Sequence, residues 1–180
     1  DLAGANLTKA DLTRANLTNA NLTNANLTNA NLTAYMTGAN LTGANLSGAH
    51  VASAILTDAD LVDANLIGAN LTAARLSGAN LTGAILRDAS LSGADLSGAN
   101  MTNASIAHGK LIDAILTDAN LSGADLTGVD LSRADLTDAN LSGANLCGAT
   151  NVILSSSGWQ SVPVPLSEQQ KKAIATCPGQ

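Results

Sequence analysis

Side chains that could do chemistry are few in this chain, and they do not cluster. Histidine occurs only at His50 and His108, which fall on different sides of the repeat pattern described below, so they do not form a metal-binding pair. Serine and threonine are abundant, but most occupy one recurring turn position and no Ser–His–Asp arrangement is indicated. Glycine also recurs at turn spacing, unlike a phosphate-binding loop. We therefore expect no enzyme activity, no cofactor and no metal.

A unit of five residues organises the chain, as in Asn21–Leu22–Thr23–Asn24–Ala25. If its central apolar residue is called i, that residue recurs 30 times between Leu2 and Leu146, and Leu fills 26 of the 30 places. Position i−2 is Ala with two exceptions, and i−1 is Asn or Asp in 21 repeats. Position i+1 is Thr or Ser in 22 repeats, and i+2 is Gly, Asn or Asp in 23 of the 29 repeats that have it.

A period of five fits neither a helix nor a flat strand. On a helix, successive centres would rotate by about 140°, and on a strand an odd period would turn Leu from face to face. A short extended piece followed by a tight turn places i−2 and i inward and i−1 outward. Gly and Asn at i+2 suit the positive φ of a type II turn. Four such sides close one coil, so 30 repeats predict about 7.5 coils stacked about 4.8 Å apart. Leu and Ala must form the core, because the chain has no Phe and 1% aromatic residues.

The run Ala15–Asn16–Leu17–Thr18–Asn19–Ala20 and its copies resemble the pentapeptide repeat family over residues 1–148. The resemblance implies an all-β fold, a right-handed quadrilateral β-helix. It implies function only weakly, because most members have none assigned, while a minority protect or inhibit type II topoisomerases by mimicking duplex DNA. Capped members of this kind are similar to those abundant in cyanobacteria.

The five-residue pattern breaks once. At Ala30–Asn31–Leu32–Thr33 the i+2 residue is missing and Ala34 follows at once, so this unit has four residues. The next unit carries Tyr35, the single tyrosine, and Met36, the first centre that is not Leu. Two interpretations stay open. The break is either a kink that presents Tyr35 to a partner, or a tolerated deletion in which a flexible Met fills a distorted coil.

If the short repeat still makes one side, every fourth i−1 residue stacks in one column. That column contains Asn16, Tyr35, Ile55, Arg75, Asp95, Ile115 and Asp135. We expect Ile55 and Ile115 to be exposed there. The flanking aspartates at i+2 are Asp58, Asp118 and Asp138, and a second side carries Ile67 and Ile85. Mixed apolar and acidic residues suggest a surface for a protein partner, although scattered surface apolar residues are also normal.

Charge is sparse, at 12% of residues, and the net charge is −6. This disfavours direct nucleic-acid binding, and no apolar run approaches the roughly 20 residues of a membrane span. Residues 58–140 carry 11 Asp against four basic residues, whereas residues 1–57 are neutral. Such an acidic surface could occupy a DNA-binding groove. A DNA mimic, however, needs a denser charge, near one per about 1.7 Å, and Asp also forms turns and keeps a rod soluble.

Residues 149–180 leave the repeat and include the single tryptophan, Trp159. Ser167 with Gln170 three residues later forms a capping-box pattern. A short helix is therefore expected over about 168–177, ending before Pro178. We interpret this segment as a cap that covers the last coil, as solenoids require. A dimer face is the alternative use.

Cys147 lies in the last repeat and Cys177 at the end of the expected cap helix. A disulfide between them would pin the cap and would indicate an oxidising compartment such as the periplasm or a thylakoid lumen. Two free thiols and a cytoplasmic location are the alternative. Because the chain opens inside a repeat, we also expect an upstream segment, either a leader or an N-terminal cap.

Taken together, these patterns predict a non-catalytic structural or protein-interaction scaffold. Its partner would be an unidentified protein rather than nucleic acid or a membrane. The exposed backbone edge of the first coil, which begins at Asp1, also allows a homodimer through an end coil. The alternative function is that of a DNA-mimic inhibitor or protector of a type II topoisomerase.

Overall fold

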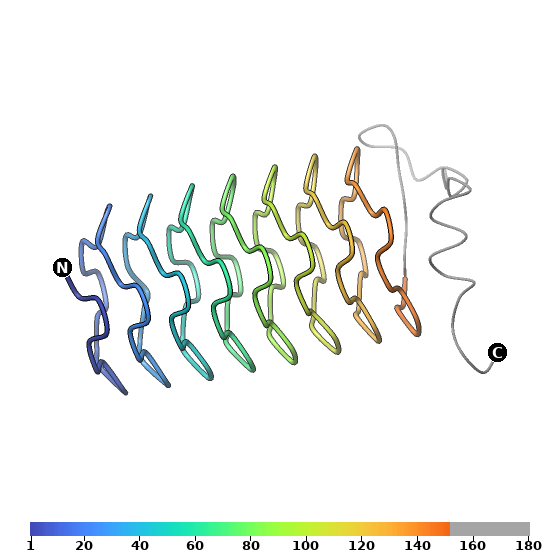
Figure 1. The fold of residues 1–180 in the computed structure, drawn as a ribbon. Helices are drawn as coiled ribbons and strands as arrows, with labels where there is room; N and C mark the ends of the chain where they lie inside the picture. The colour runs from blue at the N-terminus through green and yellow to red at the C-terminus, as the bar shows by residue number, and fades with distance from the viewer. Residues whose placement is uncertain (152–180) are drawn as a thin grey trace.

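The computed structural model describes residues 1–151, which form a rod of stacked coils (Figure 1). The coils follow one another along the rod in chain order, so each coil touches its neighbours in the sequence (Figure 1). Residues 1–151 contain no helix, and each side of a coil contributes one bridge residue rather than a longer strand. The expected cap at 149–180, with its helix at 168–177, lies outside the described residues beyond Asn151.

Parallel bridges between coils show that four repeats make one turn of the rod. Bridge partners lie 20 residues apart, as in Asn6 and Asn26, except across the short repeat, where they lie 19 apart, as in Asn16 and Tyr35. The spacing returns to 20 at Tyr35 and Ile55. The corner after Leu32 is therefore one residue shorter than the others, and all four sides keep their register. At four repeats per coil, 30 repeats make 7.5 coils, as predicted.

The core is a column of Leu and Ala side chains along the axis of the rod. From Leu22 to Leu146 every central residue is buried, and all but two of the i−2 residues of those repeats are buried too. No polar or charged residue of 1–151 is buried. Repeats of this size cannot bury their apolar side alone, so each coil depends on the next one for its core. The inward direction of i−2 and i that the sequence predicts is confirmed.

The corners confirm the predicted turn. At each corner of a complete repeat, the N–H of the following residue donates to the carbonyl of the central residue, as from Ala25 to Leu22 at 2.9 Å. Every i+2 residue has a positive φ, between 55° and 71°, which is the conformation that Gly and Asn adopt most easily. Between coils, Leu22 N–H donates to Asn40 and Asn24 N–H to Thr42, at 2.7 and 2.9 Å. Backbone hydrogen bonds thus join each coil to the next at sides and corners alike.

Candidate interaction surface

One side of the rod, called here the Tyr35 side, interrupts the asparagine ladder. Parallel bridges connect its outward residues in the order Asn16, Tyr35, Ile55, Arg75, Asp95, Ile115 and Asp135. The predicted column is therefore confirmed as a structural feature. At the corner next to it, Asp58, Asp118 and Asp138 are exposed and have positive φ.

The apolar residues of the Tyr35 side differ in exposure. Tyr35 is 51% exposed and Ile115 is 44% exposed. The expectation that Ile55 is also exposed is wrong, because it is half-buried. The backbone of Ile55 pairs with Tyr35 and Arg75 in the two adjoining coils, and we attribute its lower exposure to these two long side chains. Ile115 pairs with Asp95 and Asp135, and we attribute its higher exposure to these shorter side chains.

These apolar residues do not form one patch. Four coil steps separate Tyr35 from Ile115, roughly 19 Å at the usual strand spacing, and charged residues occupy the steps between. The side therefore presents two spots. One contains Tyr35 with Ile55, and the other contains Ile115 with its neighbouring aspartates.

The aspartates in the column also have a structural role. Oδ1 of Asp95 accepts hydrogen bonds from the N–H and the hydroxyl of Ser97, at 3.0 and 2.6 Å. Asn80 makes the same pair of bonds with Thr82, at 3.2 and 2.7 Å. Asp at i−1 thus substitutes for Asn in fixing the following turn. One carboxylate oxygen is used in this way, and the negative charge remains on the surface.

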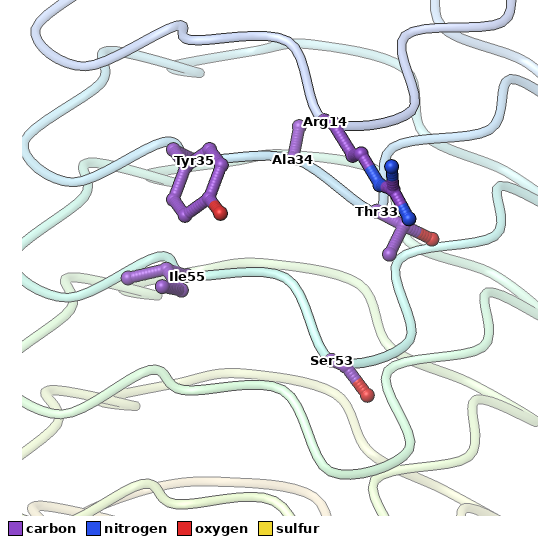
Figure 2. Close-up of a pocket in the computed structure, with 6 residues that line it drawn as sticks. All are labelled: Arg14, Thr33, Ala34, Tyr35, Ser53 and Ile55. Atoms are coloured by element: carbon purple, nitrogen blue, oxygen red, sulfur yellow. The ribbon is translucent and has the colours of Figure 1, made fainter.

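The short repeat opens a pocket of about 260 Å³ beside Tyr35, called here the Arg14 notch (Figure 2). Its lining residues are Arg14, Thr33, Ala34, Tyr35, Ser53 and Ile55. Arg14 and Ser53 are the corner residues of the coils before and after the short repeat, and the residue missing between them leaves the pocket. Figure 2 shows Tyr35 and Ile55 on one flank and the Arg14 guanidinium near Thr33 on the other.

The missing residue also leaves backbone groups without partners. Elsewhere along the rod, a corner N–H donates to the i+1 carbonyl of the next coil, as Arg14 does to Thr33 at 2.8 Å. Within residues 1–151, the corresponding carbonyl of Ala52 has no backbone donor, and the corner bond to the carbonyl of Leu32 is also missing. The N–H of Ala34, which would close that corner, has no backbone acceptor among the same residues.

Sequence reasoning identified the short repeat and Tyr35, but it missed Arg14 and Ser53 as neighbours of the break. The column of stacked corner residues could have predicted them. The short repeat leaves one position of that column vacant, and Arg14 and Ser53 lie on either side of the vacant position. The expectation that Ile67 and Ile85 share another side is confirmed. Asn65 pairs with Ile85 there, and the two isoleucines are 39% and 38% exposed.

Charged groups outside the Tyr35 side are mostly separate. Arg133 donates two hydrogen bonds to the Asp113 carboxylate one coil away, and both residues are exposed corners. These hydrogen bonds, more than the charge attraction, lower the pKa of Asp113 below its ordinary value. The pKa of Asp11 and that of Asp130 are also lowered, mainly by hydrogen bonds from the hydroxyls of Thr13 and Ser132.

The remaining candidate residues do not lie close together. His50 is at an i−1 position with its Nδ1 3.4 Å from Nδ2 of Asn70, whereas His108 is a corner residue on a different coil. Cys147 is half-buried in the last repeat, and its N–H donates to Oδ1 of Asn145 at 3.1 Å. Cys177 lies outside the described residues, so its pairing with Cys147 stays a prediction.

A search of residues 1–151 found no helix with the length and hydropathy of a membrane span.

Comparison with known proteins bears on this fold. A family model described as pentapeptide repeats matches in 8 copies over residues 1–33, 34–72, 64–103 and 114–150. Such repeats form right-handed β-helices, so the handedness inferred from the resemblance is supported. No curated protein matches the chain.

Several solved structures are similar. HetL, a protein involved in heterocyst differentiation regulation from the cyanobacterium Nostoc sp. strain PCC 7120, is 33% identical, with a TM-score of 0.54 over 81% of this chain and 80% of its own. A thylakoid lumen pentapeptide repeat protein of Arabidopsis thaliana is 33% identical, with a TM-score of 0.51 over 52% and 65%. QnrB1, a plasmid-mediated fluoroquinolone resistance protein, has a TM-score of 0.77 over 82% and 75% at 18% identity, a likeness of fold alone.

Proposed function

Because the chain belongs to the pentapeptide repeat family, we propose that it is a non-catalytic scaffold that binds a protein partner through the Tyr35 side. The observation that carries this proposal is the exposure of Ile115, which is 44%. On the other sides of the rod, most residues at this outward position are Asn or Asp. An isoleucine there adds nothing to the turn that an Asn would fix, so its apolar surface is available for a contact.

The other sides show what a column looks like when it only maintains the rod. At Asn140, Nδ2 donates to Oδ1 of Asn120 at 3.1 Å, and Asn120 in turn donates to Oγ1 of Thr102 at 3.0 Å. The polar groups of that side therefore bind one another along the rod. On the Tyr35 side this ladder is replaced by a mixture of apolar and charged residues, in which Ile115 lies between two aspartates, an arrangement that fits an apolar contact with a polar rim.

The test is a comparison of two matched substitutions. Ile115→Asn restores the ladder residue and removes the apolar surface, so the rod should fold unchanged while partner binding is lost. Ile85→Asn makes the same change on a different side at a similar exposure of 38% and should leave binding intact. Both variants and the original chain are immobilised, and proteins retained from an extract of the source cells are identified by mass spectrometry.

A retained protein that disappears with Ile115→Asn and persists with Ile85→Asn supports the proposal. Equal retention by all three proteins would assign Ile115 to ordinary surface. Circular dichroism and thermal unfolding of the two variants establish that the loss does not come from unfolding.

The compartment and the cap form a linked part of the proposal. We infer an oxidising location, the periplasm or a thylakoid lumen, with Cys147 bonded to Cys177 across a loop of roughly 30 residues that stabilises by about 3–4 kcal/mol. The lumenal Arabidopsis protein supports this location by likeness. A thiol assay on denatured, unreduced protein should detect no thiol. Two reactive thiols would instead favour the cytoplasm.

A homodimer through an end coil would be seen by analytical ultracentrifugation.

DNA mimicry remains the alternative, favoured by the exposed corner aspartates Asp118 and Asp138 beside Asp135. Against it, one carboxylate per coil in a column gives about one charge per 4.8 Å, well below the one per about 1.7 Å of duplex DNA. A gyrase supercoiling assay decides the question. Inhibition that is relieved when these three aspartates are changed to asparagine would establish mimicry, and unchanged supercoiling at micromolar protein would remove it.

A further inference from the structure

We propose that the Arg14 notch binds the C-terminal end of a peptide chain. In this arrangement the guanidinium of Arg14 and the hydroxyl of Ser53 hold the terminal carboxylate. The last amide N–H of the peptide donates to the carbonyl of Ala52, and its last side chain lies on Tyr35 and Ile55. The inference rests on the proposed protein-binding function and assigns a specific partner chemistry to one end of the Tyr35 side.

The backbone around the notch is complementary to a peptide. At a complete corner, the i+2 residue donates its N–H to the next coil, as Ser53 does to Thr72 at 2.9 Å. That residue is missing from the short repeat, so the Ala52 carbonyl has no backbone donor within residues 1–151. A ligand that occupies the vacant position must therefore offer an N–H, and a peptide offers one in every residue.

The charge at the notch selects an anion. Arg14 is exposed, and no acidic side chain of residues 1–151 lies within ion-pair distance of it. Arg133, which is also a corner arginine, binds Asp113 with two hydrogen bonds. The guanidinium of Arg14 can make the same two hydrogen bonds, but no carboxylate within residues 1–151 accepts them. This holds although the whole chain carries a net charge of −6. A carboxylate is the group that a guanidinium binds with two parallel hydrogen bonds.

The size and walls of the notch favour a chain end over an internal segment. Its volume of about 260 Å³ is below the roughly 300–1,000 Å³ of pockets that enclose drug-sized ligands, so it accommodates one or two residues. The coils that carry Arg14 and Ser53 close it along the rod axis. A C-terminus places an N–H and a carboxylate within the same residue, and the Ala52 carbonyl and the Ser53 hydroxyl belong to consecutive residues, so one terminal residue offers a group to each.

The test titrates the full ¹⁵N-labelled chain with N-acetylglycyl-leucine and follows amide shifts by NMR. Saturable shifts are expected at Ala34, Tyr35 and Ser53. The dissociation constant should be about 1 mM for so small a ligand. The same dipeptide with a C-terminal amide should bind about tenfold more weakly, since it lacks the charged hydrogen bonds. N-acetyl-aspartate N-methylamide, which imitates an internal acidic residue, should bind as weakly as the dipeptide amide.

Two variants and one control locate the site. Arg14→Gln should weaken dipeptide binding about tenfold, while Arg87→Gln, which changes an exposed arginine on the side of Ile85, should leave it unchanged. Insertion of one Gly between Thr33 and Ala34 supplies the missing N–H to Ala52. This insertion should abolish the shifts and raise the unfolding midpoint, so that lost binding cannot be ascribed to unfolding.

Three outcomes would overturn the assignment. They are an absence of saturable shifts up to about 10 mM, equal binding of acid and amide, and equal weakening by Arg14→Gln and Arg87→Gln. Equal affinity for the aspartate probe would replace the chain end with an internal acidic residue. None of these results affects the Ile115 experiment, because Ile115 lies four coil steps from Tyr35.

Discussion

The carboxylate of Asp58 fills the space beside Gly78 in which a Cβ atom would otherwise lie, one coil further along the same corner. Asp63 stands in the same relation to Gly83, and Asn24 to Gly43. Gly78 also has a φ of +69°. Two separate constraints, the left-handed backbone and the packing between coils, therefore favour glycine at such corners.

This relationship predicts that glycines of similar φ differ in their tolerance of alanine. Gly68, at φ +64°, has no neighbouring atom within 4 Å of its Cβ position. Gly68→Ala should therefore cost only the left-handed backbone strain, about 1 kcal/mol. Gly78→Ala should cost about 0.5 kcal/mol more, because the flexible Asp58 carboxylate must move to another rotamer. Urea unfolding of both variants measures the difference. In an Asp58→Gly background the two costs should converge, and a persistent difference would contradict the packing explanation.

Ala73 is a corner residue with a φ of 56°, so its backbone is strained in a way that glycine would relieve. We expect Ala73→Gly to stabilise the rod by about 0.5–1 kcal/mol, measured as a rise in the unfolding midpoint. Ala107 is the backbone control, because it stands at i+1 and does not have a positive φ, although it is buried and Ala73 is exposed. Ala107→Gly should destabilise by a similar amount. If both changes lower the midpoint, the strain at Ala73 is negligible.

The core predicts a large effect from a single truncation. Leu81 is fully buried in the middle of the rod, between Leu61 and Met101 of the adjoining coils. Leu81→Ala should destabilise by about 2–5 kcal/mol, because the coils on both sides are held by their own hydrogen bonds and cannot close the cavity. Ile85→Ala, at 38% exposure, should change the free energy of unfolding by less than about 1 kcal/mol. Equal losses would show that the rod rearranges around the cavity.

The fold could be predicted from sequence because each level of the repeat supports the same geometry. Leu at i, Ala at i−2 and Gly, Asn or Asp at i+2 each limit the chain to one side and one corner, and 30 copies repeat those limits. Even Lys9 and Arg133, which do not favour a positive φ, adopt it at corners because the neighbouring coils fix the backbone. The stacking of Tyr35 on Ile55 followed from counting alone.

The candidate sites could be predicted only in part, because exposure and pockets depend on neighbours. The exposure of Ile55 was misjudged because Tyr35 and Arg75 belong to different coils and their reach is not visible in the five-residue unit. The Arg14 notch was missed for a related reason. A deletion was recognised in the chain, but the space that it vacates lies between residues of the coils before and after it.

The Arg133–Asp113 pair gives a prediction for pH. Arg133 lowers the pKa of Asp113 in the folded chain, mainly through its hydrogen bonds. A carboxyl group whose pKa is lowered on folding stabilises the fold above its unfolded pKa of about 3.9, and that contribution disappears as the pH falls through the folded pKa. Arg133→Gln should raise the pKa of Asp113 toward the ordinary value, as measured by carbon NMR of the carboxyl group.

The stability data should follow the same sign. The original chain should exceed Arg133→Gln in stability at neutral pH, and the difference should shrink as the pH falls below about 4. Because both side chains are exposed, at 68% and 52%, the difference should also shrink in high salt. The pKa of Asp11, which depends on Thr13 at the other end of the rod, should not change and serves as the internal reference. An unchanged Asp113 pKa in Arg133→Gln would show that the pair does not form in solution.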